Sequence, residues 1–303
     1  MVHRYEHSGI VWIDLQSPSV DEIRSVSEEF KIHPLVAHEL MGPSERARID
    51  PYEDTLYLIL QFPNCAHREG SCTAMEIDFV IGDNVLITVH YAGIRAITEF
   101  RRMFEINSIL EKTRLKHAGH LFYFLIRHLY QDLGSELDII SNELARVEEN
   151  IFRGKERLMV ESLSRVSRTL IDFRRSIRGH ETILESFERA SLEFFEKPFK
   201  FYISAILGEH KKTIHLLDST QEILHELRAT NDSLVSTKTG EITKNLTLMA
   251  FVTFPLSLLA AIFGMNTENN PIVGHPFDFW IIVVVMATGM LYMFAFFKHK
   301  KWL

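Results

Sequence analysis

The chain has 303 residues, enough for one large or two ordinary domains, with 24% charged residues and a formal net charge of −7. This charge argues against nucleic-acid binding, because contacts with phosphates need a basic surface. The charged residues lie mainly within residues 1–240, whereas residues 246–297 are almost purely apolar.

The first 92 residues predict a mixed α/β domain. The opening residues, MVHRYEHSG, lack a basic segment followed by an apolar one, so we expect no cleaved signal peptide. Short runs rich in β-branched residues, bounded by Pro, Gly or Asn, indicate strands. A Ser-Pro followed by an early acidic turn indicates a helix start. The predicted strands are 10–16, 55–62, 75–82 and 85–90, and the predicted helices are 17–30 and 33–40.

The two cysteines, Cys65 and Cys72, lie in the stretch PNCAHREGSC. Two are too few for a disulfide framework, so we expect them to stay reduced. His67 lies between them and leaves a zinc site open as an alternative, although the spacing fits no common zinc motif. We favour a plain loop here.

Long amphipathic helices are predicted after about residue 93. Apolar residues at three- and four-residue steps indicate one helix over 117–152 and another over 155–190, hinged at Arg153-Gly154. A third helix is expected from Pro198 to Met265, a run of 68 residues. Gly208 and Gly240 weaken this helix without ending it.

The third helix carries an imperfect seven-residue seam. Such a seam needs partner helices, either from the same chain or from other copies, and we expect about half of it to be an intrachain contact. Five arginines on the preceding helix favour a solvated face over an anionic partner. The seam residues are Ile203, Ile206, His210, Leu217, Leu224, Leu227, Asn231 and Leu234, and the arginines are Arg165, Arg168, Arg174, Arg175 and Arg178.

No pattern of catalytic residues is evident. The sequence has no Gly-rich phosphate loop, no nucleophile elbow and no His-Glu-x-x-His helix. We therefore expect no enzyme activity and no organic cofactor.

Two apolar segments near the C-terminus predict membrane spans. Residues 246–265 hold no charged side chain, and residues 277–297 hold only Asp278, near the start of the segment. Twenty residues match the hydrocarbon thickness of a bilayer. A buried helix pair of a soluble protein is the alternative, but such a pair rarely stands this close together at the end of a chain.

Lysines flank the spans on one side only. Lys238 and Lys244 precede the first span, and Lys298, Lys300 and Lys301 follow the second, whereas the connecting loop has no Lys or Arg. By the positive-inside rule, both termini and the large N-terminal region face the cytoplasm. The loop then faces outward.

The stretch FGMNTENNP, at the outer edge of the first span, offers neutral oxygen ligands. Gly264 exposes a backbone carbonyl, and Asn266 carries a side-chain carbonyl oxygen. Such oxygens can hold a hydrated divalent cation through its waters without binding it too tightly. The alternative is a glycine turn that only caps the helix.

One face of the first span is small, weakly polar and uncharged. A single helix cannot enclose water, so a pore here requires several copies around an axis. The residues on this face, at three- and four-residue steps, are Thr243, Leu246, Ala250, Phe254, Ser257, Ala261 and Gly264.

Gly264-Met265-Asn266, placed between a first span with Pro255 and a second span, resembles the CorA family of magnesium channels. The segments VWIDLQSP, HPLVAHEL, RARIDPYEDTLYLILQF and the ending KKWL are similar to family segments too. The resemblance implies a homopentamer in the cell membrane, in contact with lipids, with the first span lining the pore. It also implies a selectivity site for hydrated Mg²⁺ made by Gly264, Met265, Asn266 and the acidic loop residue Glu268.

The chain departs from the family pattern at several positions. Ile272 stands where a second loop acid is frequent, and Gly240 stands where a pore asparagine is expected. Glu39 matches one regulatory carboxylate, but its counterpart on the stalk helix falls on Ala205. A lone carboxylate binds hydrated Mg²⁺ weakly, so we expect weak or relocated Mg²⁺ inhibition.

The expected architecture is an α+β cytoplasmic domain followed by long funnel and stalk helices and two C-terminal transmembrane helices. Within the family, transport of Zn²⁺, Co²⁺ or Ni²⁺ is the alternative to Mg²⁺. From another class, a membrane-anchored coiled-coil scaffold remains open. The predicted segments are 1–92 (α/β domain), 93–196 (amphipathic helices), 197–245 (stalk helix), 246–266 (first span), 267–276 (outer loop), 277–297 (second span) and 298–303 (basic tail).

Overall fold

The computed structural model describes residues 1–44, 46–66, 71–105, 115–195, 197–265 and 276–300. The chain divides into two compact units, Met1–Asn231 and Asp232–Leu303, which we describe separately. In the first unit, a mixed sheet and a set of long helices reproduce the expected α+β domain with its stalk.

The sheet has six strands in the order β1-β2-β6-β5-β4-β3. Only β2 and β6 are parallel, and the other neighbours are antiparallel. The four predicted strands are confirmed, whereas the two edge strands, β1 and β3, were not predicted. The side chains of β1 alternate between exposed and half-buried, and those of β3 are mostly half-buried. Neither strand therefore has a run of buried apolar residues that a sequence pattern could reveal. The strands are β1 (Val2–His7), β2 (Ile10–Gln16), β3 (Arg48–Pro51), β4 (Leu56–Ala66), β5 (Ser71–Ile81) and β6 (Val85–His90).

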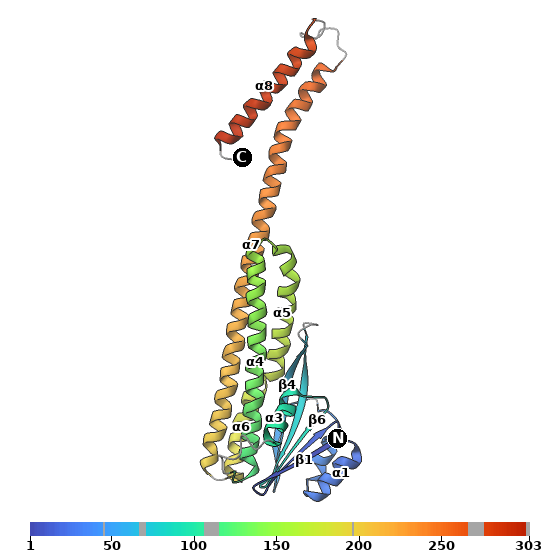
Figure 1. Cartoon of the computed structure of the whole chain (residues 1–303), viewed down its shortest axis with the longest axis vertical. Coiled ribbons are helices and arrows are strands. Elements are labelled where there is room, and N and C mark those ends of the chain that lie inside the picture. The colour runs from blue at the N-terminus through green and yellow to red at the C-terminus, as the bar shows by residue number, and fades with distance from the viewer. Residues whose placement is uncertain (45, 67–70, 106–114, 196, 266–275, 301–303) are drawn as a thin grey trace. The chain divides into compact units, whose positions relative to one another are not determined.

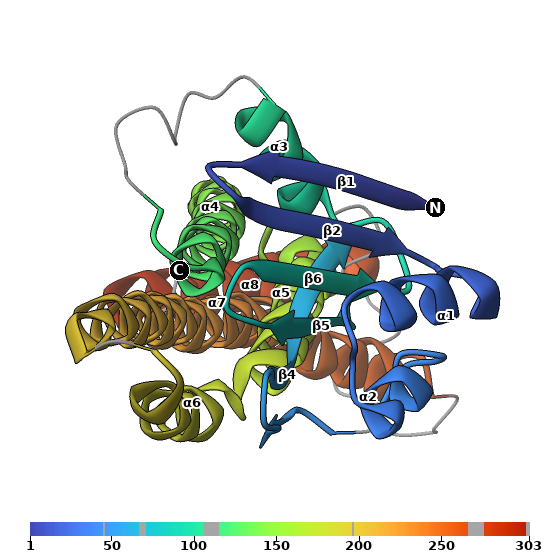
Figure 2. The same cartoon turned by 90° about the horizontal axis from the view of Figure 1, so that it is seen from below.

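Helices cover both faces of the sheet (Figure 2). On one face, α1 (Val20–Glu29) and α2 (Pro34–Glu39) pack over a core that includes Val36 and Ile87, both fully buried. On the other face, α3 (Arg95–Glu105) brings Phe100 against Trp12, and α4 (Ala118–Phe152) brings Phe122 against Phe79. The predicted helix over 17–30 starts at Val20 because Ser19 forms a capping box with Glu22.

The predicted turn after α4 is confirmed, because Gly154 has a positive φ of 85°. The single helix predicted over 155–190 is wrong, since the chain forms α5 (Glu156–Ile177) and α6 (His180–Phe194). The break places the His180 ring in the core, where Nδ1 lies 2.7 Å from Tyr130 Oη and Nε2 lies 2.8 Å from the Gln61 carbonyl oxygen. A tertiary contact has overridden a continuous helical pattern.

The arginines of α5 divide into two groups. Arg168, Arg175 and Arg178 are exposed, as expected of a solvated face. Arg165 donates to Glu143 at 2.9 Å, and Arg174 pairs with Asp218 and donates to Gln221. The paired arginines thus join α5 to the neighbouring helices.

The long third helix is confirmed as α7 (Lys200–Phe263), which has 64 residues and follows a short 3₁₀ turn at Lys197–Phe199. Gly208 and Gly240 both lie inside it, as predicted. In the first unit α7 lies beside α4 (Figure 1), with the Ser141 and Thr220 hydroxyls 3.3 Å apart. The seam is buried within one chain from Ile203 to Asn231, further than predicted, and only Leu234 remains half-exposed.

The stretch around the cysteines is a hairpin and not the predicted loop. Strand β4 continues to Ala66, and β5 begins at Ser71. Cys65 and Cys72 are register partners and are joined by a disulfide, so the prediction of reduced cysteines is wrong in this structure. Cross-strand pairing brings their Cα atoms to 4.1 Å, and the bond removes both thiols as metal ligands. His67 lies outside the described residues.

The second unit contains the end of α7 and α8 (Asp278–His299). Among the described residues, these two helices are long and apolar enough to cross a membrane. Their large apolar side chains are mostly exposed, as expected of helices whose solvent is lipid or another copy. This supports the two predicted spans.

Candidate ion pathway

One side of the membrane half of α7 is uncovered; we call it the bare face. Six of its seven residues are exposed, and Ala250 is half-buried. Leu246 and Phe254 are 62% and 73% exposed, although both are large and apolar. The bare face consists of Thr243, Leu246, Ala250, Phe254, Ser257, Ala261 and Gly264, the residues predicted to line a pore.

The opposite side of α7 faces α8 across a groove. Leu248, at 8% exposure, and Val252 line a groove together with Met290 and Phe294 of α8. At 100° per residue, Leu248 and Ser257 lie on opposite sides of the helix. Helix α8 therefore covers one side of α7 and leaves the bare face open to other molecules.

The polar groups near the bare face are neutral oxygens. The Thr243 hydroxyl donates to the Thr239 carbonyl at 2.9 Å, and its oxygen keeps lone pairs for a cation or for water. Pro255 lies inside the helix and has no N–H, so the Phe251 carbonyl loses its helical donor. Ser257 adds one exposed hydroxyl.

The helix ends where the predicted selectivity motif begins. The Gly264 N–H bonds to the Ala260 carbonyl at 2.9 Å, and the Met265 N–H bonds to the Ile262 carbonyl at 3.3 Å. A Cβ on Gly264 would lie 3.1 Å from the Ala260 oxygen, so any side chain there would be crowded. The carbonyls at a helix C-terminus carry partial negative charge and favour cations. Asn266 and Glu268 lie outside the described residues.

Glu39, the predicted regulatory residue, has a partner within its own chain. Its carboxylate forms an ion pair with Arg48, whose Nε also binds Asp50 at 2.7 Å. The Glu39 side chain is 31% exposed. A cation at Glu39 therefore has to compete with a resident guanidinium.

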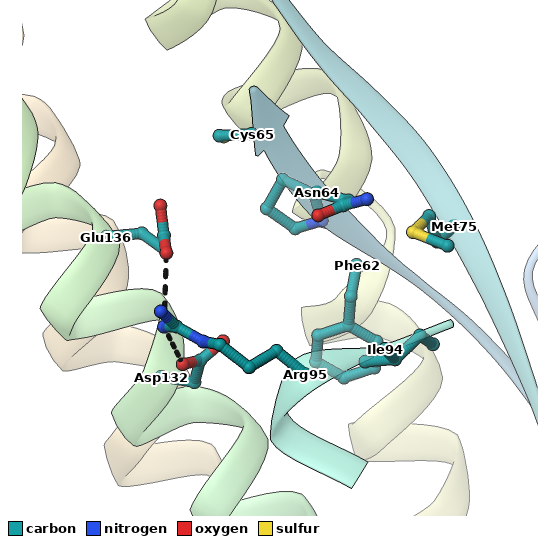
Figure 3. A pocket seen from close by; sticks show the side chains of 9 residues that line it. Phe62, Asn64, Cys65, Met75, Ile94, Arg95, Asp132 and Glu136 are labelled. Carbon is teal, nitrogen blue, oxygen red and sulfur yellow. Dashed lines mark hydrogen bonds and ion pairs between the residues drawn. The ribbon is translucent and has the colours of Figure 1, made fainter. Parts of the chain in front are cut away.

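A second acidic cluster also contains its own cation. Figure 3 shows Arg95 of α3 reaching Asp132 and Glu136 of α4, at 2.5 and 3.2 Å, in a cavity of about 190 Å³ that Asn64 and Cys65 also line. The bond to Asp132 is the main cause of the raised pKa of Arg95. The guanidinium occupies the position that a metal cation would need.

Sequence reasoning missed a buried polar network that joins three helices to the sheet. Tyr130 of α4 lies between His180 of α6 and His210 of α7, and His180 also reaches β4. Burial lowers the pKa of His180 to about 3 and also lowers that of His210, so both rings are neutral. The scattered histidines gave no signal, because the partners are 50 and 80 residues apart. Within the described parts of the chain, no group of three or more His, Cys, Asp or Glu side chains is placed to hold a metal.

Comparison with known proteins gives a consistent result. The family model of the CorA-like Mg2+ transporter protein matches residues 7–299. The "Cobalt/magnesium transport protein CorA" of Thermotoga maritima is 25% identical over 98% of this chain and 85% of its own length. The protein of the same name from Methanocaldococcus jannaschii is 22% identical over 99% of this chain and 93% of its own length.

Solved structures share the fold over almost the whole chain. The complete structure of the CorA magnesium transporter from Methanocaldococcus jannaschii aligns with a TM-score of 0.84 at 20% identity, covering 99% of this chain and 93% of that one. The full-length CmaX protein aligns with a TM-score of 0.68 at 15% identity, covering 97% and 89%. On the match across residues 7–299, the chain belongs to the CorA-like Mg²⁺ transporter family.

Proposed function

We propose that this protein is a passive channel for divalent cations that carries Mg²⁺ into the cell. The observation that carries the proposal is the bare face of α7, an uncharged face within a candidate membrane span that leads to Gly264-Met265-Asn266. The names of its relatives, which include cobalt and magnesium transport proteins, support the choice of ion.

The channel requires several copies of the chain. A single α7 helix leaves its bare face open to lipid, whereas a ring of copies, each contributing one bare face, forms the wall of a water-filled path. We propose a homopentamer, as the family resemblance implies. The exposure of Leu246 and Phe254 fits this arrangement, because neighbouring copies and the path would cover them.

We place ion selection at the outer end of α7. The carbonyl of Gly264 and the side-chain oxygen of Asn266 would bind the waters of hydrated Mg²⁺, with Met265 and Glu268 in the same loop. Mg²⁺ loses its waters reluctantly, so a ring of neutral oxygens suits it better than a tight charged cage. The absence of Cys and His from this motif disfavours softer metals such as Zn²⁺.

The membrane potential suffices to drive uptake. An inside-negative potential of about 100 mV gives about 4.6 kcal/mol for a divalent ion, from about 2.3 kcal/mol per charge. This free energy sustains an inward gradient of roughly a thousandfold. The channel therefore needs no nucleotide.

We propose that both termini and the α+β domain are cytoplasmic, with residues 267–276 outside. The support is the position of Lys238, Lys244, Lys298 and Lys300 on one side of the spans. An impermeant thiol reagent should label a cysteine placed at position 269 in intact cells. Labelling only after lysis would reverse this topology.

Regulation by cytoplasmic Mg²⁺ at Glu39 should be weak. Arg48 already neutralises Glu39, and Ala205 offers no second carboxylate on the stalk helix. We expect Glu39→Ala to change the Mg²⁺ concentration for half-inhibition less than about threefold, a difference of about 0.65 kcal/mol at 1.4 kcal/mol per factor of ten. A variant that stays open at millimolar Mg²⁺ would show instead that Glu39 is the sensor.

The decisive experiment measures Mg²⁺ uptake into proteoliposomes under an imposed potential, with Zn²⁺, Co²⁺ and Ni²⁺ as competitors. Asn266→Ala should abolish uptake and leave assembly intact, because alanine removes one oxygen ligand per subunit. Wild-type uptake by an assembled Asn266→Ala variant would favour the alternative, a membrane-anchored scaffold. Faster uptake of Zn²⁺, Co²⁺ or Ni²⁺ than of Mg²⁺ would reassign the ion within the family.

A further inference from the structure

The two candidate membrane helices leave an open groove between them. Helix α8 runs back beside the end of α7 (Figure 1), and the groove that both helices line has a volume of about 530 Å³. Leu248, at 8% exposure, and Phe297, at 6%, are the only buried side chains among the described residues of the second unit. The lining of the groove includes Asn245, Leu248, Val252 and Thr253 of α7 and Met290 and Phe294 of α8.

The groove occupies one leaflet of the candidate membrane segment. On α7 its lining lies within residues 245–253, at the start of the span, and on α8 within residues 290–297, at the end of the span. At 1.5 Å per residue the groove extends about 12 Å along α7, less than half of a hydrocarbon thickness of roughly 30 Å. It therefore lies in the leaflet beside the flanking lysines.

The interior of the groove suits a hydrocarbon chain. Leu248 and Val252 form one wall, and Met290 and Phe294 form the other. The Thr253 hydroxyl already donates to the Met249 carbonyl at 2.8 Å. Water finds few partners in such a space, and an empty space would forfeit the dispersion contacts of both walls. An apolar chain is therefore the most favourable occupant.

The end of the groove beside the lysines is polar and basic. Asn245 lines the groove at this end. Lys244 precedes Leu248 by four residues, so it lies on the groove side of α7. Lys298 follows Phe294 by four residues, so it lies on the groove side of α8. The charged residues that the structure describes within one turn of the lining are all exposed and have a formal charge of +2: Glu241, Lys244, Lys298 and Lys300.

The groove and the bare face lie on different sides of α7. Because Leu248 and Ser257 are on opposite sides of the helix, a ring of copies that meets at the bare faces leaves the groove turned away from its axis, toward lipid. A phospholipid matches both parts of the groove, since its acyl chains are apolar and its phosphate is an anion that lysine binds. Basic pockets between membrane helices hold anionic headgroups in other proteins.

We propose that the groove between α7 and α8 binds one anionic phospholipid from the leaflet beside the flanking lysines. An acyl chain would lie between Val252 and Phe294, and the phosphate would accept hydrogen bonds from Lys244, Lys298 and the Asn245 amide. The lipid would fill the space between the two spans of one chain. The proposal rests on the membrane position of the two helices and not on the ion that the channel carries.

The first test titrates the delipidated full-length protein in detergent with phosphatidylglycerol or phosphatidylcholine and counts bound lipids by native mass spectrometry. We expect one phosphatidylglycerol per chain to bind more tightly than phosphatidylcholine. Lys244→Gln and Lys298→Gln should each weaken its binding about fivefold, which is about 1 kcal/mol at 1.4 kcal/mol per factor of ten. Lys211→Gln and Lys212→Gln, at exposed positions of α7 in the first unit, should not. Equal binding of the two lipids, or equal loss in both pairs of variants, would overturn the site.

Filling the groove tests the acyl-chain part of the site. Val252→Trp places a large side chain on one wall and should lower the number of phosphatidylglycerol molecules bound per chain by about one. Val285→Trp is the matched control, because Val285 lies on the opposite side of α8 from Phe294 and does not line the groove. Unchanged binding in a folded Val252→Trp protein would show that the lipid binds elsewhere.

A second measurement needs no variant. Phosphatidylglycerol with a diazirine on its acyl chain is irradiated with the wild-type protein in phosphatidylcholine vesicles, and peptide mass spectrometry maps the adducts. They should concentrate on Val252, Met290 and Phe294, with few on Val285. Equal labelling of both sides of α8 would indicate surface lipid only, and labelling that spares the groove would indicate that a second copy fills it. Either result would refute the site, whether or not the protein carries Mg²⁺.

Discussion

The two halves of α7 each have a stripe of residues at three- and four-residue steps, but different molecules or helices cover the two stripes. From Ile203 to Asn231 the seam is buried by the helices of its own chain, and Leu217 is fully buried. From Thr243 to Gly264 the bare face has no cover, because α8 lies on the other side of the helix. A helical stripe thus shows that a partner is needed, but not which molecule provides it.

The largest expected effect comes from the bare face. Ser257→Cys should react with a charged, water-soluble thiosulfonate and lose Mg²⁺ uptake, because the added group would stand in the ion path. Val252→Cys, which faces α8, is the matched control and should keep its uptake. The native cysteines are bonded to each other and do not compete. Equal block of both variants would show that the bare face is not the path.

Substitutions in the buried seam should change the stability of the protein and not the flux of Mg²⁺. Leu217→Ala should lower the free energy of unfolding by about 2–5 kcal/mol, the usual cost of a cavity at a fully buried leucine. Phe254→Ala, at a side chain that is 73% exposed, should change the stability of the first unit little and change Mg²⁺ uptake more. Thermal unfolding of the two variants compares their stabilities directly. A larger loss of stability in Phe254→Ala than in Leu217→Ala would refute the contrast between the two halves of α7.

The network of Tyr130, His180 and His210 should make the α+β domain sensitive to acid. The folded pKa of His180, about 3, lies below its unfolded value of about 6.5, so the unfolded chain binds the proton first. The contribution of neutral His180 to the free energy of unfolding is therefore fully present above pH 6.5 and is lost as pH falls toward 3. At pH 5 the loss is about 2 kcal/mol.

Melting temperatures between pH 5 and 7 measure this effect. His180→Asn should have a lower melting temperature at pH 7, because it weakens the buried bonds, but a shallower fall toward pH 5. Parallel curves for the variant and the wild type would exclude His180 as the group responsible.

The smallest expected effect is at Asn231, where the buried part of the seam ends. This residue is 1% exposed, and both polar atoms of its amide are buried without a hydrogen-bond partner. Asn231→Leu should stabilise the first unit by about 1–2 kcal/mol, since it removes unsatisfied polar groups from an apolar site. Leu234→Asn, one turn further and half-exposed, should change stability less. A loss of stability in Asn231→Leu would mean that the native amide is satisfied.

Local patterns predicted much of the fold. Runs of β-branched residues predicted the four inner strands, and Ser19 marked the start of the first helix. Apolar periodicity predicted the continuous helix α7, and the second helix was predicted as well. The edge strands β1 and β3 were missed because half-exposed strands lack an apolar pattern. The break before His180 was missed because its cause, contact with Tyr130 and Gln61, lies far away in the sequence.

The site was only partly predictable. The residues of the bare face share one side of α7, as their spacing requires. The role of Asn266 and Glu268 remains a prediction. The ion pair of Glu39 with Arg48 and the disulfide of Cys65 with Cys72 both depend on strand pairing, which composition does not encode.

The threonines of the two candidate membrane helices bear on how the proposed channel is made. Thr243, Thr247 and Thr253 of α7 each donate to the carbonyl four residues earlier, at 2.8–2.9 Å, and Thr288 of α8 does the same at 2.8 Å. A hydroxyl bonded within its own helix needs no neighbour to enter hydrocarbon. For these four side chains, insertion into the bilayer needs no second copy, so the proposed joining of copies can follow insertion as a separate step of biogenesis.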